Sequence, residues 1–312
     1  MITRSPRVTV ALPVYNGGEY LAAAIESVLH QSFQDFEFVI SDNASTDGTE
    51  EICRSAASRD ARVRYVRHPQ NRGASWNHNH LVDLARGELF NWVGADDLNR
   101  PEFLARCVTA LDEIPEAVLA YPRTVAIDED GNTLYEYSPG WELRQDDPGE
   151  RLRSVILKGG HWVNADALTG VVRTGPLRRT RLIPAYQGGD KRPLGELSLM
   201  GKFIEIPELL HLRRFHQDSS GSNNPFFLDE DHARFDWMLE FFRGSRLPIL
   251  FPSWALLWDH LLTIWSSQLP LTKKLGLCGT LPRACSWYRR AYLGELSNAR
   301  YLLRRRRDKS HG

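Results

Sequence analysis

The sequence predicts an α/β fold: a doubly wound, mostly parallel sheet with a helical C-terminal extension. Two observations predict it. Strand-like and helix-like patterns alternate four times between residues 8 and 93, which is typical of parallel strands joined by crossover helices. Beyond residue 220 the pattern becomes helical and rich in Trp, Leu and Arg. We therefore expect a first domain over residues 1–220 and a basic helical extension over residues 221–312.

Short apolar runs mark the predicted strands, and apolar residues at helical spacing mark the predicted helices. In the first half, strands are expected at residues 8–12, 36–40, 63–66 and 88–93, with helices at 19–30, from 45, from 73 to 85 and from 101 to 113. The second half predicts strands at 117–121, 167–172 and 203–206, a hairpin of 124–127 with 132–136, and helices at 152–157, 235–242, 254–265 and 287–303.

Composition describes an ordinary globular protein, with 42% hydrophobic and 25% charged residues among 312. The net charge is zero, but the segment from Lys273 to the end has 11 Lys/Arg against 2 Asp/Glu, a local charge of +9. This tail predicts an anionic partner, whereas the acidic remainder argues against nucleic acid. Four cysteines without metal-like spacing, no signal peptide and no apolar stretch of about 20 residues predict a cytoplasmic protein.

Asp96 and Asp97 form the most informative pair, because they follow the apolar run 89–93 and precede a predicted helix. In an open α/β sheet, ligands bind where strands end. Carboxylates there suit a hard divalent cation that also holds phosphate oxygens. A polar turn with a helix N-cap is the alternative, and these residues alone leave both open.

An ordered set of motifs accompanies this pair. It comprises Pro13-Val14-Tyr15-Asn16, Glu19-Tyr20-Leu21, Ser27-Val28, Gln31, Asp42 to Asp47, Asn71-Arg72-Gly73 and Asp96-Asp97 with Pro101. Over residues 7 to 110 the set resembles the family 2 glycosyltransferases, inverting enzymes with the nucleotide-sugar-binding GT-A fold. A weaker resemblance continues through Gly188-Gly189-Asp190 to Glu196, Gly201-Lys202-Phe203 and Pro207 to Leu210.

The resemblance implies a nucleotide site. Asp42 would accept a hydrogen bond from the imide N–H of the base, which favours a UDP- or dTDP-sugar donor. The backbone of Pro13, Tyr15 and Asn16 would line the nucleotide cleft. Arg72, in a loop before a helix, would bind phosphate. The alternatives are a helix-entry cap for Asp42, a turn for Tyr15 and a solvated surface position for Arg72.

The resemblance also implies a metal and a base. Asp96 and Asp97 resemble the end of the D-x-D motif, although Gly94 replaces its usual first Asp. Asp96, with His216 as a second ligand, would hold Mn²⁺ or Mg²⁺, and Asp97 would bind sugar hydroxyls or orient Asp96. Asp190 would be the general base. The alternatives are a structural role for the histidine and helix capping by Asp190.

These inferences predict a metal-dependent inverting glycosyltransferase that moves a sugar to a glycan or lipid-linked hydroxyl acceptor, in cell-envelope polysaccharide or glycoconjugate synthesis. Gly94 leaves open a catalytically inactive nucleotide-sugar-binding module. A nucleotidyltransferase is disfavoured, because residues 13–18 contain no Lys or Arg. The tail, with Trp254, Trp258, Trp265, Trp287 and Tyr288, predicts peripheral attachment to the anionic cytoplasmic membrane face. Packing of this tail on the catalytic domain is the alternative.

Overall fold

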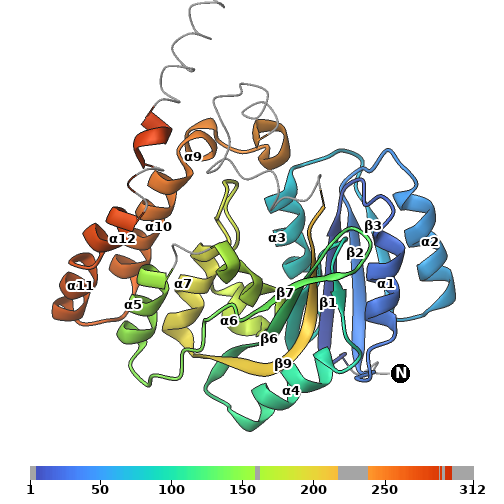
Figure 1. The fold of residues 1–312 in the computed structure, drawn as a ribbon, viewed down its shortest axis with the longest axis horizontal. Helices are drawn as coiled ribbons and strands as arrows, with labels where there is room; N and C mark the ends of the chain where they lie inside the picture. Colours follow the sequence, from blue (N-terminus) through green and yellow to red (C-terminus); the bar gives the residue numbers. More distant parts are fainter. Residues whose placement is uncertain (1–4, 159–161, 217–237, 288, 290–291, 297–312) are drawn as a thin grey trace, which may run out of the picture.

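A mixed sheet organises the computed structural model, which describes residues 5–158, 162–216, 238–287, 289 and 292–296 (Figure 1). Its described strands form one nine-stranded sheet in the order β3-β2-β1-β4-β8-β6-β9-β5, and β7 pairs with β6. The strands are β1 (Val8–Val14), β2 (Phe36–Asp42), β3 (Val63–Arg67), β4 (Leu89–Trp92), β5 (Leu98–Asn99), β6 (Ala117–Ile127), β7 (Thr133–Tyr137), β8 (Val171–Arg173) and β9 (Lys202–Arg214).

Strands β3, β2, β1 and β4 are mutually parallel, as predicted. Their crossover helices are α1 (Leu21–Leu29), α2 (Thr49–Arg59) and α3 (Ala74–Leu84). Alternate residues of one strand enter two different cores: Val10 and Leu12 face the core with α1, while Ala11 faces the core with α3. Both faces of these strands are covered by helices, which explains their continuous apolar runs. The parallel register places the carboxyl ends of β1 and β2 side by side, with Val14 opposite Asp42.

The second half of the sheet corrects three predictions. Residues 117–121 and 124–127 belong to one strand, β6, whose pairing with β9 is irregular at Pro122 and Arg123 but does not stop. The first half of the predicted strand 167–172 belongs to a 3₁₀ helix, Trp162–Thr169, and only its end lies in a strand, β8. Gly170 separates the two: a Cβ there would lie 2.4 Å from the Ala120 carbonyl oxygen, so the chain passes very close to β6. Strand β9 is much longer than 203–206, because it pairs along β6.

The remaining helices are α4 (Phe103–Glu113), α5 (Pro148–Lys158), α6 (Thr174–Arg178), α7 (Lys191–Met200), α9 (Arg246–Leu250), α10 (Pro252–Ser266), α11 (Leu271–Cys278) and α12 (Leu281–Trp287). Figure 1 shows α10, α11 and α12 beside α5 and α7, far from β1–β3. A third apolar cluster joins them, with Leu152 and Ile156 of α5 against Ile264, Leu277 and Leu281. The predicted helical extension is thus confirmed.

Parts of three predictions lie outside the described residues. These are the boundary near residue 220, the first three residues of the helix 235–242 and most of the helix 287–303. Residues 238–242 are helical as predicted, and α10 contains the predicted helix 254–265. Within the described part of the chain, no helix is both long and apolar enough to span a bilayer.

Gln31 fastens the end of α1 to the segment that follows Asp97. Its side chain is 2% exposed; Nε2 donates to the Ser27 and Arg100 carbonyls at 3.0 and 2.8 Å, and Oε1 accepts the Leu104 N–H at 2.9 Å. Buried polar groups left without partners are costly, so Gln31→Ala should lower the free energy of unfolding by about 1–3 kcal/mol. Urea denaturation measures the loss.

Gln268, an exposed glutamine just after α10, provides a control for this change. Gln268→Ala should cost less than about 0.5 kcal/mol, as is usual for surface substitutions. Equal losses in the two variants would contradict the structural role assigned to Gln31.

Candidate active site

A cavity of about 770 Å³ opens at the carboxyl ends of β1 and β4. Seven of the nine predicted site residues line it: Pro13, Tyr15, Asn16, Asp96, Asp97, Asp190 and His216. Asp42 and Arg72 are not among its lining residues. The topology explains the gathering, because the loops after parallel strands emerge at one edge of the sheet.

The loop after β1 is tied to the loop after β2. Asn16 adopts φ of +52°, a conformation that Asn tolerates better than most residues. Its N–H donates to Ser45 Oγ at 2.9 Å, and its Oδ1 accepts the Thr46 N–H at 2.8 Å. Tyr15, 46% exposed, stands on the cavity wall beside this junction. The loop is therefore ordered by its neighbour and offers Tyr15 to a ligand.

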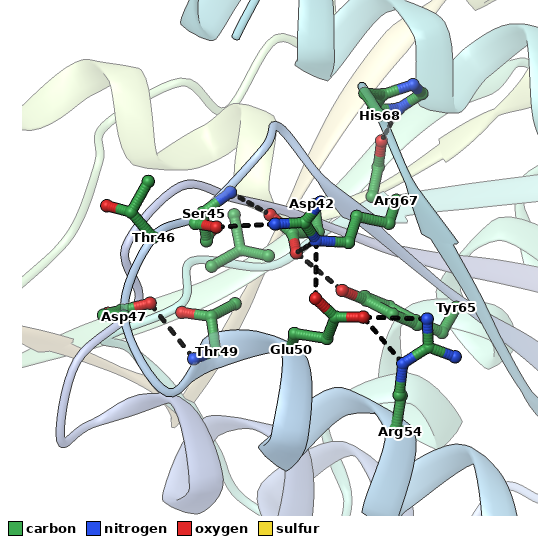
Figure 2. Close-up of polar contacts among 12 residues, drawn as sticks. Asp42, Ser45, Thr46, Asp47, Thr49, Glu50, Arg54, Tyr65, Arg67 and His68 are labelled. Atoms are coloured by element: carbon green, nitrogen blue, oxygen red, sulfur yellow. Dashed lines mark hydrogen bonds and ion pairs between the residues drawn. The ribbon is translucent and has the colours of Figure 1, made fainter. Parts of the chain in front are cut away.

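Asp42 lies at the end of β2, fully buried, and Figure 2 shows the polar network around it. Its Oδ1 accepts the Ser45 N–H at 2.8 Å, and its Oδ2 accepts the Tyr65 hydroxyl at 2.6 Å and lies 3.4 Å from Arg67 Nε. Burial, and then the Asp42 carboxylate, raises the pKa of Tyr65, which keeps that hydroxyl a donor. Both carboxylate oxygens are thus engaged. The carboxylate is fully buried, and base recognition by Asp42 stays a prediction.

Asp42 does not cap the N-terminus of helix α2. The first residue of the helix is Thr49, and its backbone N–H donates a hydrogen bond to Asp47 Oδ1 at 3.0 Å (Figure 2). Hydrogen bonding lowers the pKa of Asp47, although its partial burial acts in the opposite sense. The alternative role of Asp42 as the helix-entry cap is therefore taken by Asp47.

Arg72 is exposed, and its guanidinium lies over the Trp76 ring at 4.0 Å from the centroid. Its backbone N–H donates to Asn43 Oδ1 at 2.9 Å, which fixes the loop before α3. The side chain lies outside the cavity lining, so phosphate binding by Arg72 also stays a prediction.

Asp96 and His216 lie together on the cavity wall. His216 Nε2 is 3.1 Å from Asp96 Oδ2, and the segment after β9 is fixed there because Asp97 Oδ1 accepts the Arg214 N–H at 2.9 Å. Arg214 Nε also donates to the Asp96 carbonyl at 3.1 Å. Long-range strand pairing therefore brings together residues that are 120 positions apart in sequence.

The glycine at position 94 has a packing reason. A Cβ on Gly94 would lie 2.6 Å from Asp97 Oδ2 and 3.1 Å from Asp96 Oδ1. The Asp97 carboxylate therefore uses the space that a side chain at position 94 would need. Burial, followed by the charge of Asp96, raises the pKa of Asp97.

His211, the other histidine near the end of β9, is 2% exposed and outside the cavity lining. Its Nδ1 is 2.9 Å from Asn99 Oδ1, and burial lowers the pKa of His211 to about 4. It is thus a neutral core residue, and His216 is the histidine placed beside Asp96.

Asp96 and His216 together fit a divalent cation whose other ligands come from substrate and water. Among the residues that the structure describes, no three His, Cys, Asp or Glu side chains are grouped to hold an ion. One carboxylate and one imidazole suit Mn²⁺ or Mg²⁺ when phosphate oxygens and water complete the shell.

Asp190 immediately precedes α7, but its side chain makes no capping hydrogen bond to the helix. The capping alternative is therefore not realised. Asp190 is half-buried on the cavity wall, and burial raises its pKa. A carboxylate with a raised pKa is a stronger base than a solvated one.

The sequence prediction missed Asp166, Arg213, Glu240 and Phe241, which also line the cavity. Asp166 Oδ1 is 2.6 Å from the Arg213 guanidinium, and Asp166 Oδ2 accepts a hydrogen bond from the Tyr137 hydroxyl. Asp166 lies in a weakly patterned segment, so only the fold shows that it faces the site. Residues 240 and 241 come from the C-terminal half, and Arg243 nearby donates to the Asn71 carbonyl at 2.9 Å.

Comparison with known proteins now defines the class. Residues 9–170 match the family described as Glycosyl transferase family 2, and the chain belongs to this family. It is 32% identical over 136 residues to an uncharacterized glycosyltransferase of Methanocaldococcus jannaschii, covering 43% of this chain and 47% of the relative. It is 29% identical over 139 residues to glycosyltransferase GlyG of Streptococcus pneumoniae, covering 45% and 46%. The chain thus spans about half the length of these curated relatives.

Solved structures share the architecture. S. aureus TarS in complex with UDP-GlcNAc superposes with a TM-score of 0.65 at 14% identity, covering 89% of this chain and 72% of TarS. The mannosyltransferase PcManGT from Pyrobaculum calidifontis, in complex with GDP-Man and Mn²⁺, gives 0.50 at 17% identity, covering 94% and 85%. At these identities the likeness shows the fold, and the predicted GT-A-like architecture is confirmed.

Proposed function

We propose that this protein is a metal-dependent inverting glycosyltransferase that moves a sugar from a nucleoside diphosphate donor to a hydroxyl acceptor. One observation carries the proposal: a candidate cation-binding pair, Asp96 and His216, and a candidate base, Asp190, line the same cavity. Membership of family 2 agrees with it.

The residues divide the reaction between them. Asp190 takes the proton of the acceptor hydroxyl while that oxygen attacks the anomeric carbon, and the bond to the diphosphate breaks on the opposite face. One base is enough, because inversion needs no covalent intermediate. Asp96 and His216 would hold the cation, which when bound would supply positive charge against the departing diphosphate. Asp97, fixed by the Arg214 N–H, orients Asp96.

We place the donor among UDP- and dTDP-sugars and the acceptor among glycan or lipid-linked hydroxyls, in cell-envelope polysaccharide or glycoconjugate synthesis. The complex of TarS with UDP-GlcNAc supports a uridine donor, and the PcManGT complex supports Mn²⁺ as the cation. The second candidate, an inactive nucleotide-sugar-binding module, is favoured by Gly94 alone. Release of free nucleoside diphosphate, measured with and without manganese, separates the enzyme from the module.

A thermal-shift screen of UDP, dTDP, GDP and ADP, each with Mn²⁺, tests the donor assignment. A ligand that binds only the folded state at about 100 times its Kd stabilises it by about 2.7 kcal/mol. UDP or dTDP should therefore raise the melting temperature more than the purine nucleotides. Equal shifts for all four, or a larger shift with GDP, would contradict the assignment.

We also propose peripheral binding at the anionic cytoplasmic membrane face. An exposed apolar row on α10 supports it: Trp254, Trp258, Leu262 and Trp265 are 44, 61, 38 and 50% exposed and recur at helical spacing. The predicted contributions of Tyr288 and residues 297–312 lie outside the described residues, as does the Trp287 side chain. Tyr292 packs edge-on against Trp254 at 5.0 Å, so part of this region does contact its own chain.

Vesicle co-sedimentation tests the membrane proposal. Binding should increase with anionic lipid and fall with salt, because basic residues near such a surface contribute about 1 kcal/mol each. Trp258→Ser should weaken binding, whereas Tyr135→Ser, an exposed aromatic change on β7, should not. Equal sedimentation with neutral and anionic vesicles would reject the proposal.

A further inference from the structure

A buried carboxylate of the C-terminal extension contacts the segment that carries Asp190. Asp259 lies in α10 and is 6% exposed. Its Oδ1 accepts a hydrogen bond from the Arg181 guanidinium at 2.8 Å, and its Oδ2 accepts the Tyr186 hydroxyl. Arg192 NH1 lies 3.6 Å from the same Oδ2. Tyr186 and Arg192 stand on either side of Asp190 in the sequence, so one carboxylate holds both ends of the short segment that carries it.

The segment between these two contacts is tightly folded. Gly188 adopts φ of +74°, a left-handed turn that favours glycine. A Cβ on Gly189 would lie 2.5 Å from Pro184 Cγ, so the turn is packed against the preceding chain. Arg192 also donates to the Leu182 and Arg181 carbonyls at 2.9 and 2.6 Å. Tyr186 and Arg192 are thus joined to Asp190 by a short, closely packed stretch of chain.

We propose that Asp259 is a positioning residue for catalysis: through Tyr186 and Arg192 it sets where the Asp190 carboxylate stands in the cavity. The inference rests on the proposed function of Asp190 as general base, and it gives the extension a role in the reaction. A catalytic group must be held close to its productive geometry, and a displacement of about 1 Å can cost on the order of 10²-fold in rate. A hydrogen-bonded charge network fixes position better than apolar contact does.

The extension has other attachments, so loss of the Asp259 charge does not remove its docking. The apolar cluster of Leu152, Ile156, Ile264, Leu277 and Leu281 joins it to α5. Within the extension, Glu295 is a second buried carboxylate; it is 7% exposed and accepts the Ser253 N–H at 3.0 Å. Glu295 thus provides a matched control for Asp259.

Three variants of the full chain test the inference, with kcat, donor KM and melting temperature measured for each. Asp259→Asn keeps the size but removes the charge that lies against Arg192 and that shares Arg181 with Glu196. We expect kcat to fall about tenfold to a hundredfold while donor KM stays within about twofold. Tyr186→Phe keeps every buried charge and should lower kcat by a smaller factor, so it replaces the first variant if that one fails to fold. Glu295→Gln should leave kcat within about twofold. A fall in kcat with Glu295→Gln as large as with Asp259→Asn would overturn the inference.

Two further measurements separate positioning from general damage. If Asp259 acts through Asp190, adding Asp259→Asn to the Asp190→Asn variant should lower kcat by less than about twofold. The reason is that the rate losses of residues that act together do not multiply. Amide exchange of residues 186–192 should accelerate about tenfold in Asp259→Asn, with residues 94–97 unchanged. Multiplicative rate losses, or unchanged exchange at 186–192, would overturn the positioning role. Parental transfer by Asp190→Asn would instead refute the base assignment, and with it the catalytic consequence of Asp259.

Discussion

Replacement of Asp96 by alanine should abolish metal-dependent sugar transfer and leave the fold intact. Asp96 lies 3.1 Å from His216, the other side chain that we propose as a ligand of the cation. Its loss removes an anionic ligand and with it charge stabilisation worth several kcal/mol, so kcat should fall on the order of 10³-fold. The measurement is product formation at saturating donor over a range of Mn²⁺ concentrations, with the melting temperature recorded alongside.

Asp130 serves as the control for this change, because it is an exposed carboxylate in the hairpin between β6 and β7. Asp130→Ala should retain near-parental turnover. If Asp96→Ala turns over at a near-parental rate with saturating donor, the cation site has been assigned to the wrong residue.

The second large effect is expected from Asp190→Asn. The amide has nearly the size of the carboxylate but cannot accept the acceptor proton, so the transfer rate should fall on the order of 10²–10⁴-fold. Donor affinity, measured by titration calorimetry with the nucleotide and Mn²⁺, should remain near the parental value. A parallel collapse of donor affinity would show that Asp190 binds the donor or supports the fold instead.

The pH dependence of the parent follows from the same residue. Catalysis needs the carboxylate, and burial raises its pKa, so kcat should fall as pH decreases through a value above the ordinary range of Asp. The raised pKa means that the folded state disfavours the ionised form, so at neutral pH the charge destabilises the fold. Asp190→Asn should therefore unfold at a temperature no lower than the parent, while losing activity. Full parental activity well below the ordinary Asp pKa would contradict the assignment.

The parallel half of the sheet was predictable because burial on both faces leaves a strong apolar signal in each strand. The positions of Asp96, Tyr15 and Asn16 followed, since loops after parallel strands share one edge. What the pattern could not show was which partners a side chain would take. Asp42 is engaged by Tyr65 and Ser45, and Arg72 stacks on Trp76, because contacts across the chain decide those positions.

Residues 117–127 and 202–214 show why the second half was harder. Strands β6 and β9 pair with one another along their length, and that long-range pairing overrides the local break expected at Pro122. The same pairing brings Arg213 to the cavity, where it meets Asp166 of the 3₁₀ helix. No spacing within the sequence marks such a pair as facing a ligand.

Residues of the C-terminal half line the cavity, and this restricts which sequence changes the two halves tolerate independently. Glu240 and Phe241 line the site, and the Phe242 carbonyl lies against Gly73, where an added Cβ would be 2.5 Å away. The segment shared with the family ends at residue 170, yet its ligand cavity is completed by residues some 70 positions later. A chimera that joins this family segment to the C-terminal half of a relative would therefore inherit a mismatched active-site wall. The two halves can change only in step with one another.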